Sequence, residues 1–423
     1  MSTPRQLGLL SATALVVANM IGTGVFTTSG FLLADLKSPR AVLAVWAVGG
    51  VHAALGALSY GALARRIPES GGEYLFLSRT LYPAAGYVAG WLSLLVGFAA
   101  PLAAAAFAFG EYAKPWFPGW SPKLSGSLLL LVFTAVHSFH VQRGAWVQNL
   151  TVLVKVILIV GFAGFAFTRL EVTGPAGPAE FTAPAFGVCL VWVSFSYFGW
   201  NAAVYVGGEV RDPERSLPRS LLLGTAIVTT LYLALNTVFV FSAPVQELAG
   251  KLEIGRIAGR AIGGPKLEEA VAVLVTLTLV SCVSAMVMAG PRVYARMAAD
   301  GYLPRWLAVA EGPPRASIAL QSGLALVMVW SATYDALLTY IGFTLGLSTA
   351  ATVFGLVLLR LREGAQLRVP GWPWVPGLFL LSVLAMTIFC IARRPMESLV
   401  GLATIAVGWI AWQLSERRKR RRG

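Results

Sequence analysis

The sequence predicts an all-α polytopic membrane protein with twelve transmembrane helices. Of its 423 residues, 57% are hydrophobic and 12% are charged, whereas a soluble globular protein carries about 25% charged residues. Twelve apolar runs are each long enough to cross a bilayer as a helix, which takes roughly 17–25 residues. The runs are continuous, and they lack the ten-residue alternation of an outer-membrane β-barrel.

The expected helices are separated by short polar or glycine- and proline-containing segments. In chain order, the predicted spans are 7–35, 40–64, 83–112, 124–141, 146–168, 184–208, 218–242, 267–297, 316–333, 335–360, 373–391 and 397–414. The first run is too long for the core of a cleavable signal peptide. The chain is therefore expected to be spent on spans, with no large soluble domain.

The net charge of +14 is explained by membrane topology better than by nucleic-acid binding. If the amino terminus is inside, most of the 33 lysines and arginines fall on the cytoplasmic side, as the positive-inside rule requires. This distribution predicts that both termini are cytoplasmic. It also predicts that the basic tail faces anionic lipid and binds no nucleic acid.

Two interruptions stand in the first and sixth runs. NMIGTGVF (19–26) places Gly22 and Gly24 mid-span, where each glycine weakens a helix by about 0.5–1 kcal/mol. Alone, this motif could serve close helix packing. FSYFGWN (195–201) places Gly199 at the equivalent position if the chain contains two inverted repeats of five spans. Paired interruptions of this kind indicate the central site of a transporter.

Unwound segments expose backbone N–H and C=O groups at the membrane midplane, where they must line a cavity or hold a ligand. The amino terminus of a half-helix favours a carboxylate, and free carbonyls favour an ammonium group. A zwitterionic α-amino acid carries both groups, so the sequence predicts an amino acid as substrate.

Four motifs occur in a fixed order: IGTGVF (21–26), ARRIPESGGEYLFLSR (64–79), FSYFGWNAAVYVGGEVRDPERSLPRS (195–220) and AGPRVYARMAADGYLP (289–304). Together they resemble the L-type branch of the amino acid–polyamine–organocation superfamily. The resemblance implies a LeuT-type five-plus-five inverted repeat with discontinuous first and sixth helices. The implied division is 1–170 and 184–360 for the two repeats, 372–414 for two further helices and 415–423 for a basic cytoplasmic tail.

The resemblance also implies a substrate site. The amides of Thr23 and Gly24 would hold the substrate carboxylate, carbonyls at both interruptions would face its amino group, and Phe195 would be the gate. The implied binding residues are Met20, Ile21, Thr23, Gly24, Phe195, Ser196, Phe198, Gly199 and Asn201. Asn201 could equally pack its own helix. Large-substrate relatives have glycine where this chain has Phe198, which favours small neutral L-amino acids unless the ring rotates outward.

Lys155 lies within the apolar run TVLVKVILIV (151–160). A charged residue inside a span is costly, so a functional role is the first interpretation. The alternative is snorkelling to the interface. The resemblance implies that the lysine takes the place of the cation of sodium-coupled relatives, with Ser281 and Ser284 as candidate partners. We therefore expect sodium-independent exchange, with proton-coupled symport on the same fold as the alternative.

No aspartate or glutamate is predicted at the midplane, which argues against cationic substrates and against a membrane enzyme. A channel or a non-transporting sensor is also disfavoured, because no filter repeat or soluble signalling domain is visible. Loop charges could form an ion-pair network at the cytoplasmic side or remain solvated: Glu69, Glu73, Arg79, Glu209, Arg211, Asp212, Arg215 and Arg219.

Cofactors and covalent partners are not expected. The three histidines show no metal-ligand spacing, so no metal site or other cofactor is predicted. The loop 111–123 lacks the cysteine with which eukaryotic L-type carriers bond an ancillary subunit, so none is expected here. The excess of arginine over lysine suggests a bacterial origin, and hence the inner membrane as the plasma membrane in question.

Overall fold

The computed structural model describes residues 7–139, 145–170, 182–299, 301–308 and 313–420. Over these residues the chain is helical and contains no β-strand, which confirms the all-α prediction. A single isolated bridge joins Leu7 to Val210. In this bridge the Leu7 N–H donates to the Glu209 carbonyl at 3.0 Å, and the Arg211 N–H donates to the Leu7 carbonyl at 2.8 Å.

The helices follow the predicted runs through the described residues. The first half contains α1 (Leu9–Met20), α2 (Gly24–Leu36), α3 (Pro39–Arg66), α4 (Gly72–Thr80), α5 (Pro83–Leu92), the π-helical turn η1 (Ser93–Ala99), α6 (Ala100–Ala113), η2 (Lys114–Trp116), α7 (Pro122–Phe139) and α8 (Ala145–Phe167). The second half contains α9 (Ala183–Tyr197), η3 (Ala202–Glu209), α10 (Pro213–Phe241), α11 (Val245–Leu248), α12 (Ile254–Ala299), η4 (Arg305–Leu307), α13 (Arg315–Ser331), α14 (Tyr334–Glu363), η5 (Gly364–Gln366), α15 (Trp374–Arg393) and α16 (Pro395–Arg420).

Several helix starts are specified by their own side chains. Ser38 accepts a hydrogen bond from the Ala41 N–H at 3.3 Å, and Pro39 occupies the first turn of α3. Thr182 and Thr333 cap α9 and α14 in the same way. A hydroxyl at this position satisfies one of the otherwise unpaired first amides, and proline in the first turn loses no hydrogen bond.

Each predicted span coincides with a helix or a group of helices, but the count of twelve is not confirmed. By length and composition, nine helices among the described residues can cross a membrane, and the bent pair α1–α2 raises this to ten. Length explains one difference, because α13 has only 17 residues. The helix α8 is 23 residues long, which is enough to cross a bilayer.

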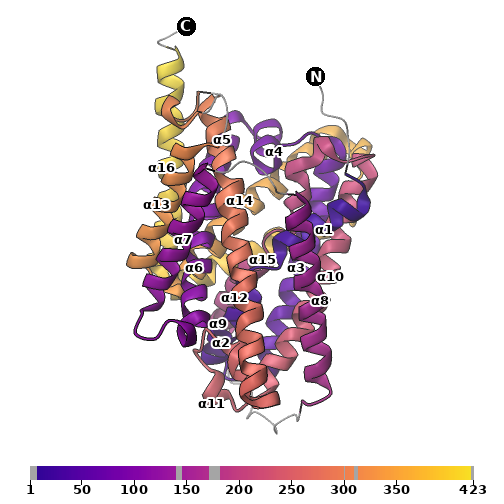
Figure 1. The fold of residues 1–423 in the computed structure, drawn as a ribbon. Helices are drawn as coiled ribbons and strands as arrows, with labels where there is room; N and C mark the ends of the chain where they lie inside the picture. The colour runs from indigo at the N-terminus through magenta and orange to yellow at the C-terminus, as the bar shows by residue number, and fades with distance from the viewer. Residues whose placement is uncertain (1–6, 140–144, 171–181, 300, 309–312, 421–423) are drawn as a thin grey trace.

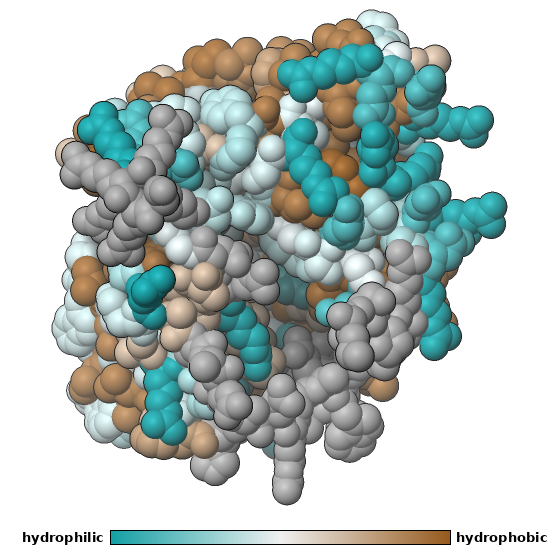
Figure 2. Space-filling model, turned by 90° about the horizontal axis from the view of Figure 1, so that it is seen from above, coloured by the Kyte–Doolittle hydropathy of each residue, from teal (hydrophilic) through white to brown (hydrophobic). Residues whose placement is uncertain are grey.

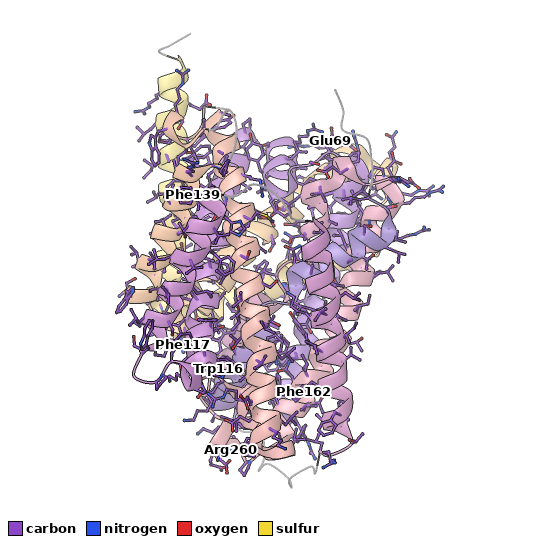
Figure 3. The ribbon with its side chains drawn as sticks, in the orientation of Figure 1. Glu69, Trp116, Phe117, Phe139, Phe162 and Arg260 are labelled. Atoms are coloured by element: carbon purple, nitrogen blue, oxygen red, sulfur yellow. The ribbon has the colours of Figure 1, made fainter. Side chains whose placement is uncertain are left out.

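The helices form one bundle in which α1 begins and α16 ends at the same end (Figure 1). We call this the termini end. Glu69, in the segment before α4, lies there, whereas Arg260 lies at the opposite end (Figure 3). Hydrophilic side chains gather on the face of the termini end, with hydrophobic ones along parts of its rim (Figure 2). The common location of both helix ends agrees with the predicted topology.

The outer surface of the bundle is apolar. On α15, Leu381, Leu384 and Ile388 are each more than half exposed, and their spacing places them on one helix face. Soluble monomers rarely expose continuous apolar faces of this kind. The face therefore fits contact with lipid, as expected for a multi-pass membrane protein.

The centre of the bundle is formed where α3 and α10 pack along each other and against α1 and α9. The helix α2 packs on α9, and α14 packs on both α9 and α4. These contacts bring the two predicted interruptions to the same depth in the core.

Candidate functional site

The first interruption separates α1 from α2. The first helix ends at Met20, the second begins at Gly24, and their axes differ by 43°. The first amides of any α-helix lack a partner within the helix and form its positive end. Thr23, the residue before α2, is only 4% exposed. The amino-terminal end of α2 is thus held inside the protein.

The second interruption separates α9 from η3. The Phe198 N–H closes α9 by donating to the carbonyls of Ser194 and Phe195, each at 3.1 Å. Gly199 then adopts a φ of +109°, a conformation that glycine reaches without the steric penalty other residues incur. The glycine of FSYFGWN is therefore required by the backbone geometry.

The two interruptions contact each other directly. A Cβ atom on Gly24 would lie 2.6 Å from the Cα of Ser196, and one on Gly199 would lie 2.6 Å from the Asn19 carbonyl carbon. The Thr28 hydroxyl also lies 3.1 Å from that of Ser196. The structure therefore brings the predicted residues of both motifs together, with backbone packed on backbone.

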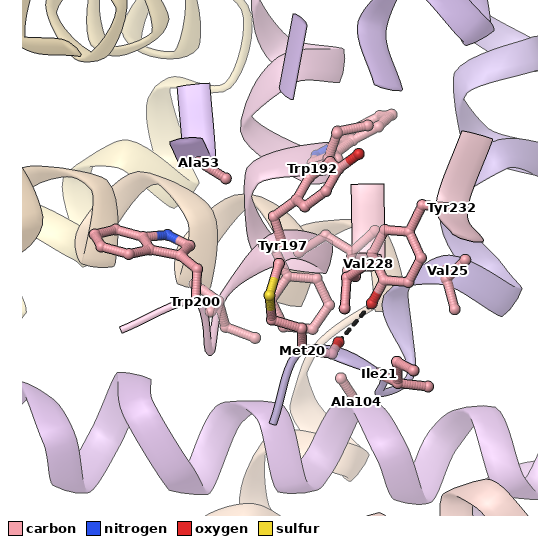
Figure 4. Packing of buried hydrophobic residues seen from close by; sticks show 14 of the residues in the cluster. Met20, Ile21, Val25, Ala53, Ala104, Trp192, Tyr197, Trp200, Val228 and Tyr232 are labelled. Carbon is pink, nitrogen blue, oxygen red and sulfur yellow. Dashed lines mark hydrogen bonds between the residues drawn. The ribbon is translucent and has the colours of Figure 1, made fainter. Parts of the chain in front are cut away.

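Tyr232 of α10 joins the ends of the two interrupted helices. Its hydroxyl donates to the Met20 carbonyl at the end of α1 (Figure 4) and lies 3.1 Å from the Ser196 carbonyl near the end of α9. A phenol has one proton and can fully satisfy only one carbonyl at a time. The two carboxyl-terminal ends thus retain acceptor capacity at this point. Nothing in the sequence singled out Tyr232 as a member of the site.

Replacing Tyr232 with phenylalanine removes this link and little else. We expect the free energy of unfolding to fall by about 1–3 kcal/mol, because a buried carbonyl loses its donor, and transport to fall several-fold. Thermal melts and uptake by the reconstituted protein measure the two effects. The control is Tyr340→Phe, which removes a 3.0 Å hydroxyl contact to Thr404 between α14 and α16. If both variants transport equally, Tyr232 has no special place at the site.

Further polar contacts fix α2 against its neighbours. The Thr27 hydroxyl lies 2.6 Å from that of Tyr334, and the Tyr112 hydroxyl donates to the Phe26 carbonyl at 2.7 Å. Ser29 accepts from the Trp46 indole at 2.8 Å and donates to Asn236. Asn236 is fully buried within a span, and a polar residue in that position is the signal that could have identified it.

Phe195 and Phe198 occupy different environments. Phe195 is 9% exposed and belongs to the buried core, whereas Phe198 is partly buried at the carboxyl end of α9 and packs against that core. The backbone at Phe198 is no longer helical. Its ring therefore stands at the interruption itself.

Asn201 does not face the crossing of the two interruptions. Its side-chain amide donates to a carboxylate oxygen of Glu73 at 3.0 Å, which supports its packing role over a direct substrate role. Glu73 is 7% exposed, and burial raises its pKa above the ordinary value. Within the described residues Glu73 forms no ion pair, and it is buried, so both predictions for it, an ion-pair network and a solvated loop charge, were wrong.

One exposed ion pair of that predicted network is present. Arg79 and Glu69 form an ion pair at 2.6 Å, with both side chains about half exposed. Such surface pairs contribute about 0–1 kcal/mol. Arg65, Arg215 and Arg219 instead line a pocket of about 270 Å³ with Glu214 and Pro218. The loop charges are therefore distributed over separate local contacts.

Lys155 is 7% exposed on α8 and lies within electrostatic range of the Cys282 thiol on α12. The Cys282 sulfur in turn would lie 3.8 Å from a Cβ on Gly22 of the first interruption. Cys282 thus lies next to the first interruption and within electrostatic range of Lys155. In the described chain no hydrogen bond joins Lys155 to Ser281 or Ser284, and the Ser284 hydroxyl contacts His137 at 2.9 Å.

Comparisons with known proteins cover nearly the whole chain. A family model described as amino acid permease matches residues 7–412. The mouse (Mus musculus) Asc-type amino acid transporter 1 is 27% identical and large neutral amino acids transporter small subunit 2 is 29% identical, each over 96% of this chain and 80% of the relative. The mouse b(0,+)-type amino acid transporter 1 is 25% identical over 93% of this chain and 84% of its own length.

Proposed function

Because the chain belongs to the amino acid permease family, we propose that it carries small neutral L-amino acids across the membrane by alternating access, as a sodium-independent exchanger. Like its family, it is a transporter and not an enzyme. The observation that carries the proposal is the crossing of the two interrupted helices. It brings the amino-terminal end of α2 to the carboxyl-terminal ends of α1 and α9.

This arrangement is complementary to a zwitterion. We assign the substrate carboxylate to the amides of Thr23 and Gly24, next to Ile21, where a helix amino terminus favours an anion. The ammonium group is assigned to the carbonyls of Met20, Ser196 and Phe198, because the carboxyl-terminal ends of α1 and α9 carry partial negative charge. The Phe195 carbonyl already accepts from the Phe198 amide. The Phe195 ring is the proposed gate, and Gly199 allows the close approach of the two backbones.

The size of the accepted side chain is assigned to Phe198. Replacing it with glycine should admit larger neutral amino acids such as leucine, since a phenyl ring is removed from the interruption. Competition by unlabelled amino acids against labelled alanine measures the change. Leu190→Ala, a buried truncation earlier on α9, is the control for general loosening of the helix. An unchanged substrate profile in Phe198→Gly would remove the argument for small substrates.

A counterflow screen in proteoliposomes tests the whole proposal. Vesicles loaded with one unlabelled amino acid should accumulate labelled small neutral amino acids, and replacing sodium with choline should leave the rate unchanged. Uptake into empty vesicles driven by a pH gradient would favour the alternative, a proton-coupled symporter on the same fold. Absence of transport for all twenty amino acids would leave the sensor alternative.

We further propose that the termini end faces the cytoplasm of a bacterial inner membrane and that the chain works without a disulfide-linked ancillary subunit. One relative is named a small subunit, but each of the three cysteines of this chain is a free thiol on a helix, Cys189 and Cys390 being fully buried. None is positioned in the loop 111–123. Protease accessibility of loops in oriented vesicles tests the topology.

A further inference from the structure

Glu73 is a buried carboxylate in α4, the short helix at the termini end. The Tyr60 hydroxyl and the Asn201 amide donate to its Oε1 atom at 2.8 and 3.0 Å. The Ser348 hydroxyl donates to its Oε2 atom at 3.2 Å. These donors come from α3, from the segment after the second interruption and from α14. One carboxylate therefore ties together four parts of the chain.

The surroundings of this carboxylate are polar but uncharged. The titratable groups that act on it are phenols, Tyr60 from α3 and Tyr205 from η3. On α14, Ser348 contacts it and Thr352 contacts Tyr60. Phenols have an ordinary pKa of about 10 and are neutral at physiological pH. No positive charge thus compensates Glu73 within the described residues.

The remaining titratable groups nearby face other partners. Glu69 and Arg79, on the same segment as Glu73, pair with each other in solvent. Arg362 of α14 donates to the Thr80 carbonyl at the far end of α4. The helix α5 also packs on α4, but its Tyr87 hydroxyl donates to the Tyr302 carbonyl, and the ring of the preceding Tyr82 lies against Trp409. The carboxylate therefore depends on its three neutral donors.

Burial and hydrogen bonding act in opposite directions on this group. Removing a carboxylate from water disfavours its charged form, while donors favour it. Burial has the larger effect and raises the pKa of Glu73. An ionised carboxylate without a cation is costly in this position, and access to water would relieve that cost.

We propose that Glu73 is a proton-binding site that holds the termini end closed when occupied. A protonated Glu73 can satisfy every contact, because its O–H can donate to Ser348 while its other oxygen accepts from Tyr60 and Asn201. Release of the proton to water at the termini end leaves a charge that is stabilised when water enters. Deprotonation therefore favours separation of Asn201 from Glu73. The proposal rests on alternating access as the proposed function.

Transport against pH at the termini end tests the proposal. If the transport rate is proportional to the deprotonated fraction of Glu73, it rises by up to about tenfold per pH unit below the pKa of that group. Wild-type exchange should therefore rise by about threefold or more between roughly pH 5 and pH 8. Glu73→Gln copies the protonated group, so it should match the wild type at low pH and remain slow at high pH. Glu69→Gln, which removes an exposed carboxylate on the same segment, should keep the wild-type pH profile.

A second variant changes the midpoint and leaves the carboxylate in place. Ser348→Ala removes one donor to the charged form, so the midpoint of the pH profile should move to higher pH. A Glu73→Gln profile that follows the wild type, or a Ser348→Ala midpoint that does not move, would overturn the proton site.

Thermal stability separates this proposal from the proposed function, because it requires no transport. The raised pKa means that the folded state binds the Glu73 proton more tightly than the unfolded state does. This stabilisation is complete below the unfolded pKa of about 4.3 and is lost as pH rises through the folded pKa. The Tm of Glu73→Gln should therefore rise relative to the wild type with increasing pH. A constant Tm difference would contradict the proposal even in a protein that transports amino acids.

Discussion

Replacing Gly199 with alanine should abolish transport. The φ of +109° places alanine in a conformation that costs about 1–3 kcal/mol. The new methyl group would also lie 2.6 Å from the carbonyl carbon and oxygen of Asn19, and overpacking of this kind costs about 1–3 kcal/mol more. The backbone of the first interruption cannot yield without losing its contact with the second. Counterflow activity and thermal melts measure the two consequences.

The matched control is Gly323→Ala on α13, where a Cβ atom would meet nothing within 4 Å. In a helix interior this change should stabilise the protein by about 0.5–1 kcal/mol, so the two variants should move Tm in opposite directions. Gly199→Ala protein that melts and transports like the wild type would show that the crossing of the interruptions is not needed.

Replacing Lys155 with alanine should reduce transport by more than about tenfold, which corresponds to 1.4 kcal/mol of lost transition-state stabilisation. Lys155 is buried and lies within electrostatic range of Cys282, whose sulfur is next to Gly22 of the first interruption. Placing a charged side chain within a membrane span is energetically costly, so a lysine in this position is expected to have a function. Uptake rates normalised to the amount of reconstituted protein measure the effect.

Two further variants assign the loss to the charge. Lys155→Met keeps most of the apolar stem but removes the ammonium, so it should be as impaired as the alanine variant. Lys266→Ala removes an exposed lysine near the start of the apolar part of α12 and should transport normally. Wild-type rates in both Lys155 variants would show that the lysine only fills space.

The fold was largely predictable because the bilayer restricts the possible structures. Each predicted apolar run contains a helix, and the glycine motifs at both interruptions fall where helices end. The exact number of spans was less predictable. Length and hydropathy separate membrane helices from shorter apolar ones only approximately, as the 17-residue α13 illustrates. The boundaries of the two inverted repeats remain a prediction.

The candidate site was predictable only where its chemistry is local in sequence. Gly24 and Gly199 were visible as motifs, and their contact follows from the folding of two distant segments. Tyr232 gave no such signal, because one tyrosine in a span resembles any interfacial or packing residue. Glu73 was predicted as a loop charge, since nothing in ESGGEY indicates that α3 and α14 cover it. Both residues are buried by elements that are distant in sequence, which could not be predicted from the residues around them.

The bridge between Leu7 and Val210 is built from main-chain atoms alone. It ties Leu7, two residues before the start of α1, to the segment that follows η3. Side-chain replacement at these positions leaves the hydrogen bonds of the bridge in place. Alanine scanning would pass over it for the same reason. Its signature in a mutational survey would be intolerance to proline at Leu7 or Arg211, whose amides are the donors.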